Sequence, residues 1–539
     1  MLSFGSVIGA GMQAPGRGAA PSRRSTPRGV LVACALACLP VASCSRTTGA
    51  RADAAADGSG GGVVRIGVAA LPKPTVGELA PADPMGVLAS DLVFDGVTDW
   101  DAAKRRVAPG VAKSWTTTDG ISWMFTIDPL AEFSDGTPVT ADSVVAALTE
   151  VARGGGLAGG RLDVIAGVKE FRAGGAATIR GLVATDASTL TIEMSSANYE
   201  LPALLADPSY GIGRPTGDGE AGAAQVVGSG PFVPVASDGT TLRLAPAESD
   251  IDGVSAIEFV AFGSDDAAMK AYEAGSVDVA PAANGVALVE AGGDARFRVS
   301  AGTLMLSVSN LAPPLADVGV RRALLAGVDR EAAVAAMGDA WAVANGVVPG
   351  DLVSAAVCDA SCGVDDAVAR NGLMGLAATG APLHLDVPAG DVAARLAAEL
   401  ERQIEVVGVP VEVRPVDGAA LEQAVGGGGS ELLLFAQVGL APSVDPYLAQ
   451  GFAGGGGENV SGMSSPEFDS ALAVARATSD ADARADAYRQ AEAIVVSNGA
   501  ALPLAELGRT YAVRRSVRGV QPVSGVLFDG RSVHVAANR

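Results

Sequence analysis

Residues 88–148 decide the fold of this chain, with the sequence LASDLVFDGVTDWDAAKRRVAPGVAKSWTTTDGISWMFTIDPLAEFSDGTPVTADSVVAAL. Residues 88–97 place apolar side chains at Leu88, Leu92 and Val93, and this spacing predicts a short amphipathic helix. The stretch also holds three of the four tryptophans in the chain, which we expect to form the core of a local subdomain: Trp100, Trp115 and Trp123.

Turn signals divide the rest of this stretch into two strands and a helix. Residues 111–117 and 123–127 favour strands, and the dipeptide Asp119-Gly120 between them is typical of a hairpin. Thr140 is a predicted N-cap for the helix that follows. The pattern therefore predicts a small mixed unit of helix and antiparallel sheet.

Four segments follow one another in this stretch: LVFDGVTDWD, PGVAKSW, DGISWMFTI and FSDGTPVTADSV. In this order they resemble the extracytoplasmic solute-binding proteins that serve ABC importers, in particular family 5, which includes oligopeptide-, dipeptide- and nickel-binding proteins. Later segments agree unevenly with the same family, among them VVGSGPF at 226–232 and SPEFD at 465–469. The resemblance implies an α/β, periplasmic-binding-protein-like fold of class II, with two lobes and an extra subdomain on the first lobe.

Composition and motifs narrow the function classes. A chain of 539 residues is too long for one hydrophobic core, and its net charge of −22 argues against a general nucleic-acid binder. No lysine has a serine three residues before it, and neither a HExxH zinc helix nor a GxSxG elbow occurs. We therefore expect no enzyme and no cofactor.

The N-terminus predicts export and a lipid anchor. Arginines precede an apolar run at 30–41, which is too short to span a bilayer permanently. Val41-Ala42-Ser43-Cys44 closes the run and resembles the lipobox of bacterial lipoproteins, which implies acylation of Cys44. The alternative is a cytoplasmic protein with a buried apolar start. We expect an extracytoplasmic protein held to the cell membrane by its lipid.

The remaining cysteines predict a local disulfide. Cys358 and Cys362 lie in the segment CDASC, and an oxidising compartment favours a bond between them. The alternative is a two-thiol metal site. Only His384 and His534 are present as histidine ligands, and no second Cys or His pair is visible to complete such a site.

The chain order gives the expected domains. Residues 154–160 predict a flexible break, and residues 383–415 predict a β-α-β unit. We place the first crossing between lobes just after Phe262 and the second after Leu502. The expected parts are a signal peptide at 1–43, a tether at 44–62, lobe I at 63–262 with the accessory subdomain at approximately 88–200, lobe II at 263–502, and a return to lobe I at 503–539.

The resemblance also suggests ligand-binding positions. In the family, the loop after the first strand lines the ligand cleft, and after the strand at 432–435 a tryptophan and an aspartate usually contact the peptide. Here those two positions hold Gly439 and Pro442, and Asp445 can either replace the acid or serve in a turn. The weak candidates for ligand contact are Lys73, Pro74, Gly230, Ser309, Asn310, Gly439, Pro442 and Asp445.

The expected function is the capture of a small solute, such as an oligopeptide, between two lobes that close around a hinge. The expected partners are the subunits of an ABC permease, the membrane through the N-terminal lipid, and no nucleic acid; we expect a monomer. The alternative is a non-transport envelope scaffold or regulatory lipoprotein with the same fold, which the missing tryptophan and aspartate favour. An enzyme is the third possibility.

Overall fold

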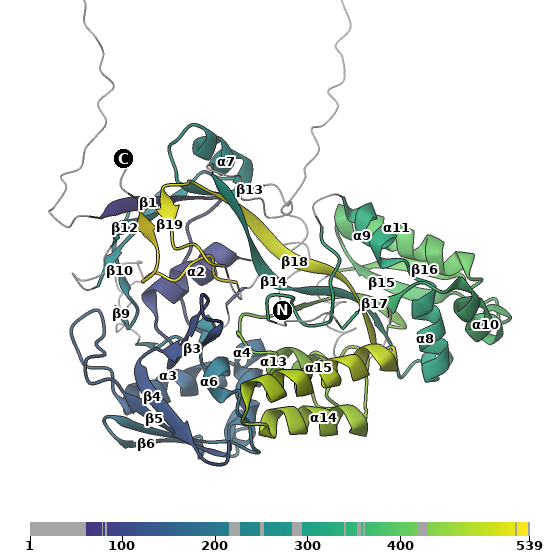
Figure 1. The fold of residues 1–539 in the computed structure, drawn as a ribbon, viewed down its shortest axis with the longest axis horizontal. Helices are drawn as coiled ribbons and strands as arrows, with labels where there is room; N and C mark the ends of the chain where they lie inside the picture. Colours follow the sequence, from purple (N-terminus) through teal and green to yellow (C-terminus); the bar gives the residue numbers. More distant parts are fainter. Residues whose placement is uncertain are drawn as a thin grey trace, which may run out of the picture.

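The long strands of one sheet organise the molecule (Figure 1). A ten-stranded sheet runs in the order β10-β11-β12-β1-β13-β18-β14-β17-β15-β16. Helices lie at both ends of it, and the smaller sheets lie at the lobe I end, so the sheet joins two lobes. The computed structural model describes residues 61–77, 79–80, 83–214, 227–247, 253–282, 294–338, 341–352, 357–358, 362–417, 430–522 and 525–536.

Two hinge strands, β14 and β18, run side by side across the centre of the molecule (Figure 1). β14 has 14 residues, so it is roughly 45 Å long and reaches into both lobes. Its first half pairs with the end of β18, and its second half lies between β17 and the start of β18. The strand bulges at Gly302, where φ is 148° and an added Cβ would lie 2.0 Å from the Gln437 carbonyl oxygen. The bounds are Ala295–Val308 for β14 and Ala501–Val513 for β18.

The sheet passes from one lobe to the other within these two strands. The expected crossing just after Phe262 is too early, because β13 pairs with β1 on the lobe I side of the sheet. We therefore place the first crossing inside β14 and the second inside β18.

Lobe I is built from parallel pairing of β1 and β12, with Ile66 opposite Phe259 at its centre. The apolar face of α2 covers this sheet through Leu88 and Leu92, which confirms the predicted helix for residues 88–93, although α2 ends at Val93 and not at residue 97. Its elements are β1 (Gly62–Val68), α2 (Pro84–Val93), β10 (Phe232–Ser237), β11 (Thr241–Pro246), β12 (Val254–Ala261), α7 (Asp265–Glu273), β13 (Val279–Ala282), β19 (Val517–Arg518) and β20 (His534–Val535).

The accessory subdomain has its own sheet, in the order β4-β5-β7-β6, and its own core around Phe125. Thr140 caps α3 with a reciprocal hydrogen-bond pair, as predicted. Trp123 lies in this core and Trp115 packs against it, whereas Trp100 belongs to neither group, so the expectation of a tryptophan core is wrong for Trp100. The elements are β2 (Thr98–Asp101), β3 (Arg106–Pro109), β4 (Ala112–Thr117), β5 (Ser122–Ile127), α3 (Ala141–Gly154), α4 (Gly156–Arg161), η1 (Leu162–Val164), α5 (Val168–Arg172), β6 (Leu182–Asp186), β7 (Thr189–Glu193), α6 (Leu201–Leu204), η2 (Pro208–Tyr210), β8 (Gly213–Arg214) and β9 (Val227–Gly228).

The predicted flexible break at 154–160 is wrong. Gly155 turns the chain with a φ of 70°, and α4 begins at once at Gly156. The glycines permit close packing, because an added Cβ at Gly159 would lie 2.9 Å from the Val151 carbonyl oxygen. This tight corner directs the end of α4 towards lobe II.

Lobe II contains the predicted β-α-β unit, in which β15 and β16 are parallel and α11 connects them. The side chains of Leu396 and Leu400 on α11 are fully buried against the sheet. A second layer, α13 to α15, packs beneath the hinge strands (Figure 1). The elements are η4 (Pro313–Leu315), α8 (Val318–Ala326), α9 (Arg330–Met337), α10 (Asp366–Ala377), β15 (Leu383–Pro388), α11 (Asp391–Val406), β16 (Val411–Val416), β17 (Leu432–Val438), α13 (Asp445–Phe452), α14 (Pro466–Ala477) and α15 (Ala481–Asn498).

Cys358 and Cys362 are joined by a disulfide, with their Cα atoms 5.1 Å apart. Both side chains pack into the lobe II core. Cys44, the expected signal peptide and most of the expected tether lie outside the described residues. Among the residues that the structure describes, no helix is both long and apolar enough to cross a membrane.

Candidate solute-binding site between the lobes

Arg161 joins the accessory subdomain to lobe II. It ends α4, is 7% exposed, and donates from Nη2 to the Val438 carbonyl oxygen at 3.1 Å. Its Nη1 bonds the fully buried Asp207 at 3.2 Å. We call the contact formed by Arg161, Val438, Gly439 and Leu440 the seam. A buried guanidinium needs such partners, because an unpaired buried charge is strongly unfavourable.

Gly439 lets Arg161 approach the end of β17. An added Cβ at Gly439 would lie 2.8 Å from the Tyr447 hydroxyl oxygen and 2.9 Å from Arg161 Nη2. Both distances are below normal contact, so the guanidinium and the phenol occupy the space of any larger side chain. The position at which the family places a tryptophan is therefore filled by groups from two other elements.

A second set of polar contacts lies beside the seam. Glu200, which precedes α6, accepts a hydrogen bond from Ser443 at 2.7 Å and pairs with Arg484 of α15 at 2.6 Å. The backbone N–H of Tyr199 donates to the Arg476 carbonyl oxygen at 2.8 Å. These contacts hold the accessory subdomain against α14 and α15.

The sheet next to the seam carries two unsatisfied polar groups. Thr303 and Gln437 are paired across β14 and β17, and they are 0% and 1% exposed. Within the described residues, neither Thr303 Oγ1 nor Gln437 Oε1 has a hydrogen-bond partner. Buried polar atoms are nearly always hydrogen-bonded, so these two are exceptions, and neither residue lines a described pocket.

An acidic pocket of 40 Å³ adjoins the seam, between the two lobes. Asp91 of α2, Asp99 and Trp100 of β2, and Asp529 line it from lobe I, while Leu440 and Pro442 line it from lobe II. We call it the acid pocket. A smaller pocket shares Asp91, Asp99 and Asp529 with it and reaches Asp95, Asp207 and Arg531. Asp207 thus connects the acid pocket to Arg161.

Crowding of carboxylates governs the charge of the acid pocket. Burial, followed by the charges of Asp99, Asp529 and Asp95, raises the pKa of Asp91 well above its usual range. Burial and the neighbouring Asp95 likewise raise the pKa of Asp99 to about 6. Arg531 offsets only part of this, since it pairs with Asp95 and lies 3.6 Å from Asp99 Oδ2.

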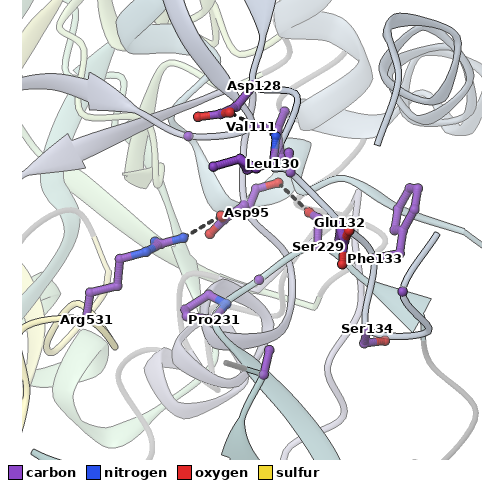
Figure 2. A pocket seen from close by; sticks show the side chains of 15 residues that line it. Asp95, Val111, Asp128, Leu130, Glu132, Phe133, Ser134, Ser229, Pro231 and Arg531 are labelled. Carbon is purple, nitrogen blue, oxygen red and sulfur yellow. Dashed lines mark hydrogen bonds and ion pairs between the residues drawn. The ribbon is translucent and has the colours of Figure 1, made fainter. Parts of the chain in front are cut away.

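A larger pocket of about 720 Å³ lies where the accessory subdomain meets lobe I (Figure 2). Figure 2 shows Asp95 bonded to Arg531 on one side and to Ser229 on the other. Gly230 lines this pocket, not the seam, and an added Cβ there would lie 2.4 Å from the Val93 carbonyl carbon. The glycines of 226–232 therefore serve first to pack the chain against the end of α2.

Ser309 and Asn310 do not reach the seam. Both residues follow the end of β14 that lies away from the seam. Gly302, which is opposite Val438, precedes Ser309 by seven residues, which is roughly 24 Å along the strand. The Ser309 hydroxyl accepts from two backbone N–H groups of the next turn, and Asn310 Nδ2 donates to Asn498 at 2.9 Å. Both residues hold lobe II together.

Lys73 and Pro74 lie on the loop after β1 and line none of the described pockets. Lys73 is exposed and Pro74 is half-buried. The same loop does reach the seam, but through Leu79, which packs with Val87 against Leu440. The candidate loop is therefore well placed, and the contacting residue is six positions later than Lys73.

Asp445 has a structural role at the start of α13. It is 5% exposed, accepts two hydrogen bonds from Arg476 at 2.6 and 3.0 Å, and accepts a third from the Tyr488 hydroxyl at 3.1 Å. These bonds fix α13 against α14 and α15. Of the two roles considered for Asp445, the structure favours the local one over ligand contact.

The sequence interpretation missed Arg161 and the acid pocket. One local signal was available, because Asp91 interrupts the apolar run Leu88-Ala89-Ser90-Asp91-Leu92-Val93. Asp529 carries no comparable signal, since only the fold brings it beside Asp91. In the described part of the chain, no group of three or more His, Cys, Asp or Glu side chains has the arrangement of a metal site.

Comparison with solved structures identifies the fold. The unliganded open form of the periplasmic murein tripeptide-binding protein MppA matches with a TM-score of 0.72 and 19% identity, covering 88% of this chain and 98% of that one. Haemophilus influenzae OppA in complex with RPPGFSPFR matches with a TM-score of 0.65 and 17% identity, covering 89% and 99%. The chain thus shares its fold with these two proteins, which confirms the expected periplasmic-binding-protein-like architecture.

Sequence comparison gives the family. Residues 106–459 match the model for bacterial extracellular solute-binding proteins, family 5, middle region. The chain belongs to this family. A putative binding protein of Haemophilus influenzae is 32% identical over 126 residues, which cover 23% of this chain and 24% of that relative. The matched stretch therefore spans about a quarter of the length of that relative.

Proposed function

We propose that this protein captures a peptide or similar small solute between its lobes and delivers it to an ABC permease. The observation that carries the proposal is the seam, where Arg161 from one side of the hinge strands meets Val438 and Gly439 on the other. Unsatisfied polar atoms of Thr303 and Gln437 lie in the sheet beside it. We infer that opening of the lobes exposes these groups to an entering solute.

Hinge motion supplies the mechanism. Among the strands of the described residues, β14 and β18 alone extend through both lobes, so a change in their twist moves the lobes against each other. Opening has to break the Arg161 bond to Val438 and the apolar contact of Leu79, Val87 and Leu440. Solute contacts that replace these interactions favour closure, and the closed form presents both lobes to the permease together.

Anchoring completes the proposal. Cys44 is acylated, the segment up to residue 62 is the tether, and the protein acts outside the cytoplasmic membrane as a monomer. The family resemblance of Val41-Ala42-Ser43-Cys44 supports this assignment. A Cys44→Ala variant that still partitions with membranes would exclude it.

The direct test is to find the solute. Protein purified under native conditions is denatured, and the released small molecules are identified by mass spectrometry. We expect a stoichiometric solute, and a rise in melting temperature when peptide pools or cell extract are added to solute-free protein. Protein that carries no solute and shows no thermal shift with either would exclude solute capture.

The non-transport scaffold remains a second candidate, because one observation favours it. Arg161 and Tyr447 fill the space beside Gly439 without any solute. A protein that closes on itself is suited to bind other envelope proteins by its outer surface. Failure of the solute search, together with capture of the same envelope protein by wild type and by an Arg161→Met variant, would favour this function.

A further inference from the structure

We propose that residues 341–352 form a pH-sensitive strap, which holds the lobes together at acidic pH and loosens them as the pH rises. The strap lies in lobe II between α9 and the disulfide. Its first part pairs with the hinge strand β18, its middle covers a buried carboxyl group, and its end meets the accessory subdomain. The inference goes beyond the proposed function, because it concerns the solute-free protein and holds for any solute.

The first part of the strap lies along β18. The Ala344 N–H donates to the Leu504 carbonyl oxygen at 2.9 Å. Two residues further along β18, the Glu506 N–H donates to the Ala342 carbonyl oxygen, also at 2.9 Å. β14 pairs with the other edge of β18 at these residues. Movement of the strap therefore changes the pairing of one of the two strands about which the lobes turn.

A buried carboxyl group lies under the middle of the strap. Glu492 of α15 is 1% exposed, and its Oε1 accepts the Val348 N–H at 3.0 Å. Gly346 permits this approach, because an added Cβ there would lie 2.2 Å from Glu492 Oε1. Among the described residues, the other oxygen of Glu492, Oε2, is buried and has no hydrogen-bond partner. Such surroundings favour the neutral acid over the anion, since an anionic oxygen without donors or water is costly.

A second carboxyl group holds the end of the strap. Glu506 of β18 accepts the Gly350 N–H through Oε1 at 3.3 Å. Burial, followed by the charge of Asp351, raises the pKa of Glu506 to about 7, although Arg298 of β14 opposes the shift. The strap thus places its own Asp351 beside a carboxyl group of the hinge strand.

Both carboxyl groups titrate near neutral pH while the strap is in place. Burial raises the pKa of Glu492 to about 7, and only the N–H groups of Val347 and Val348 oppose this among the described residues. Once the strap moves away and water reaches Glu492 and Glu506, each pKa falls towards the usual 4.5. Strap opening then releases protons, so its equilibrium constant rises with pH from about 4.5 to about 7 and is constant above that.

The end of the strap connects the lobes. The Asp351 carbonyl oxygen accepts a hydrogen bond from Arg105 Nη2 at 2.7 Å. Arg105 lies in the turn between β2 and β3 of the accessory subdomain, and its φ of 49° is in the region that favours glycine. Glycine would adopt this backbone more easily, but it could not reach Asp351. Opening of the strap displaces Asp351 and so breaks this contact between the lobes.

Hydrogen exchange of the solute-free protein tests the strap. Mass spectrometry follows a peptide that contains residues 346–350, with rates corrected for the intrinsic effect of pH on amide exchange. We expect strap opening to increase about tenfold or more between about pH 5.5 and about pH 7.5. Opening that does not change with pH would overturn the proposal, and this measurement needs no variant.

Variants assign the pH response to the two carboxyl groups. Glutamine has the shape of the neutral acid and does not ionise, so Glu492→Gln should remove about half of the response on a logarithmic scale. Glu492→Gln combined with Glu506→Gln should remove nearly all of it. Glu405→Gln, at an exposed position on α11, is the matched control. Because Asp99 also has a raised pKa, of about 6, a full response in the double variant would assign it elsewhere and overturn the proposal.

Arg105→Met tests the connection to the other lobe. The variant loses a hydrogen bond that favours the closed strap, so opening should rise about threefold or more at both pH values. Arg106→Met, at the exposed neighbouring position, should leave opening unchanged. Small-angle scattering of wild type should give a larger radius of gyration at about pH 7.5 than at about pH 5.5, and the double glutamine variant should show no difference. Strap opening without a change in the radius of gyration, or unchanged exchange in Arg105→Met, would overturn the coupling between strap and lobes.

Discussion

Asp445 and Asp91 are two carboxylates near the same segment of lobe II, and their surroundings are opposite. Asp445 lies three residues after Pro442 and is satisfied by Arg476 and Tyr488. Asp91 shares a pocket with Pro442 from across the seam and has no partner among the described residues. The difference separates a carboxylate that holds helices together from one that no described residue pairs with, whereas the sequence left Asp445 open to either ligand contact or a turn role.

The largest expected effect is the loss of Asp445. Asp445→Ala leaves the Arg476 guanidinium largely buried without its partner, and breaking such a pair costs about 3–5 kcal/mol of unfolding free energy. Urea unfolding followed by circular dichroism measures it. Glu405→Ala, an exposed carboxylate on α11, is the control and should change stability by less than about 0.5 kcal/mol.

A double variant sharpens this prediction. Asp445→Ala with Arg476→Met removes both charges, so no buried charge is left unpaired, and a large part of the lost stability should return. If Asp445→Ala instead unfolds like wild type and loses affinity for a pool of tripeptides with free amino termini, Asp445 contacts the solute and the contrast with Asp91 fails.

Gly439 gives a smaller effect at the seam itself. An alanine Cβ would crowd the Tyr447 hydroxyl and Arg161 Nη2, at 2.8 and 2.9 Å. Gly439→Ala should therefore lower the unfolding free energy by about 1–3 kcal/mol, the usual cost of overpacking. The Arg161 bond to Val438 should weaken as well, which favours the open arrangement of the lobes.

Thermal unfolding measures the first effect, and small-angle scattering of the solute-free protein measures the second as a larger radius of gyration. Gly455→Ala is the matched control, because an added Cβ there meets nothing within 4 Å. A Gly439→Ala variant with unchanged stability and scattering would mean that the seam is already open in solution.

Local sequence patterns predicted the elements well and the site poorly. The Thr140 cap and the β-α-β unit at 383–415 depend on neighbours within a few residues, so their signals are contained in short segments. The match to family 5 likewise came from ordered segments of 88–148. The glycines of 154–160 misled because their small size serves packing of α4, not freedom of the chain.

The acid pocket could not be predicted for a different reason. Asp91 and Asp99 come from two adjacent elements, whereas Asp529 and Arg531 arrive from the C-terminal segment more than four hundred residues later. Their meeting depends on β18 returning the chain to lobe I. Matching segments to the family pointed to Gly439 and Pro442, where this chain lacks the tryptophan and aspartate usual in the family. It gave no reason to consider lobe I, whose carboxylates lie across the seam from these two positions.

The smallest expected effect is a gain in unfolding free energy when Asp91 is replaced, opposite in sign to the losses expected for Asp445→Ala and Gly439→Ala. Its pKa is raised above the usual 3.8, so ionised Asp91 costs folded-state stability, and that cost is absent below about pH 4. Wild type should lose stability as the pH rises from about 4 through the pKa of Asp99, about 6. Asp91→Asn should therefore gain about 1 kcal/mol of unfolding free energy at about pH 7.5 and nothing at about pH 4, measured by urea unfolding.

The exposed Asp266→Asn is the control and should shift neither value. A loss of stability in Asp91→Asn at neutral pH would show that Asp91 is paired in solution, and the contrast with Asp445 would disappear.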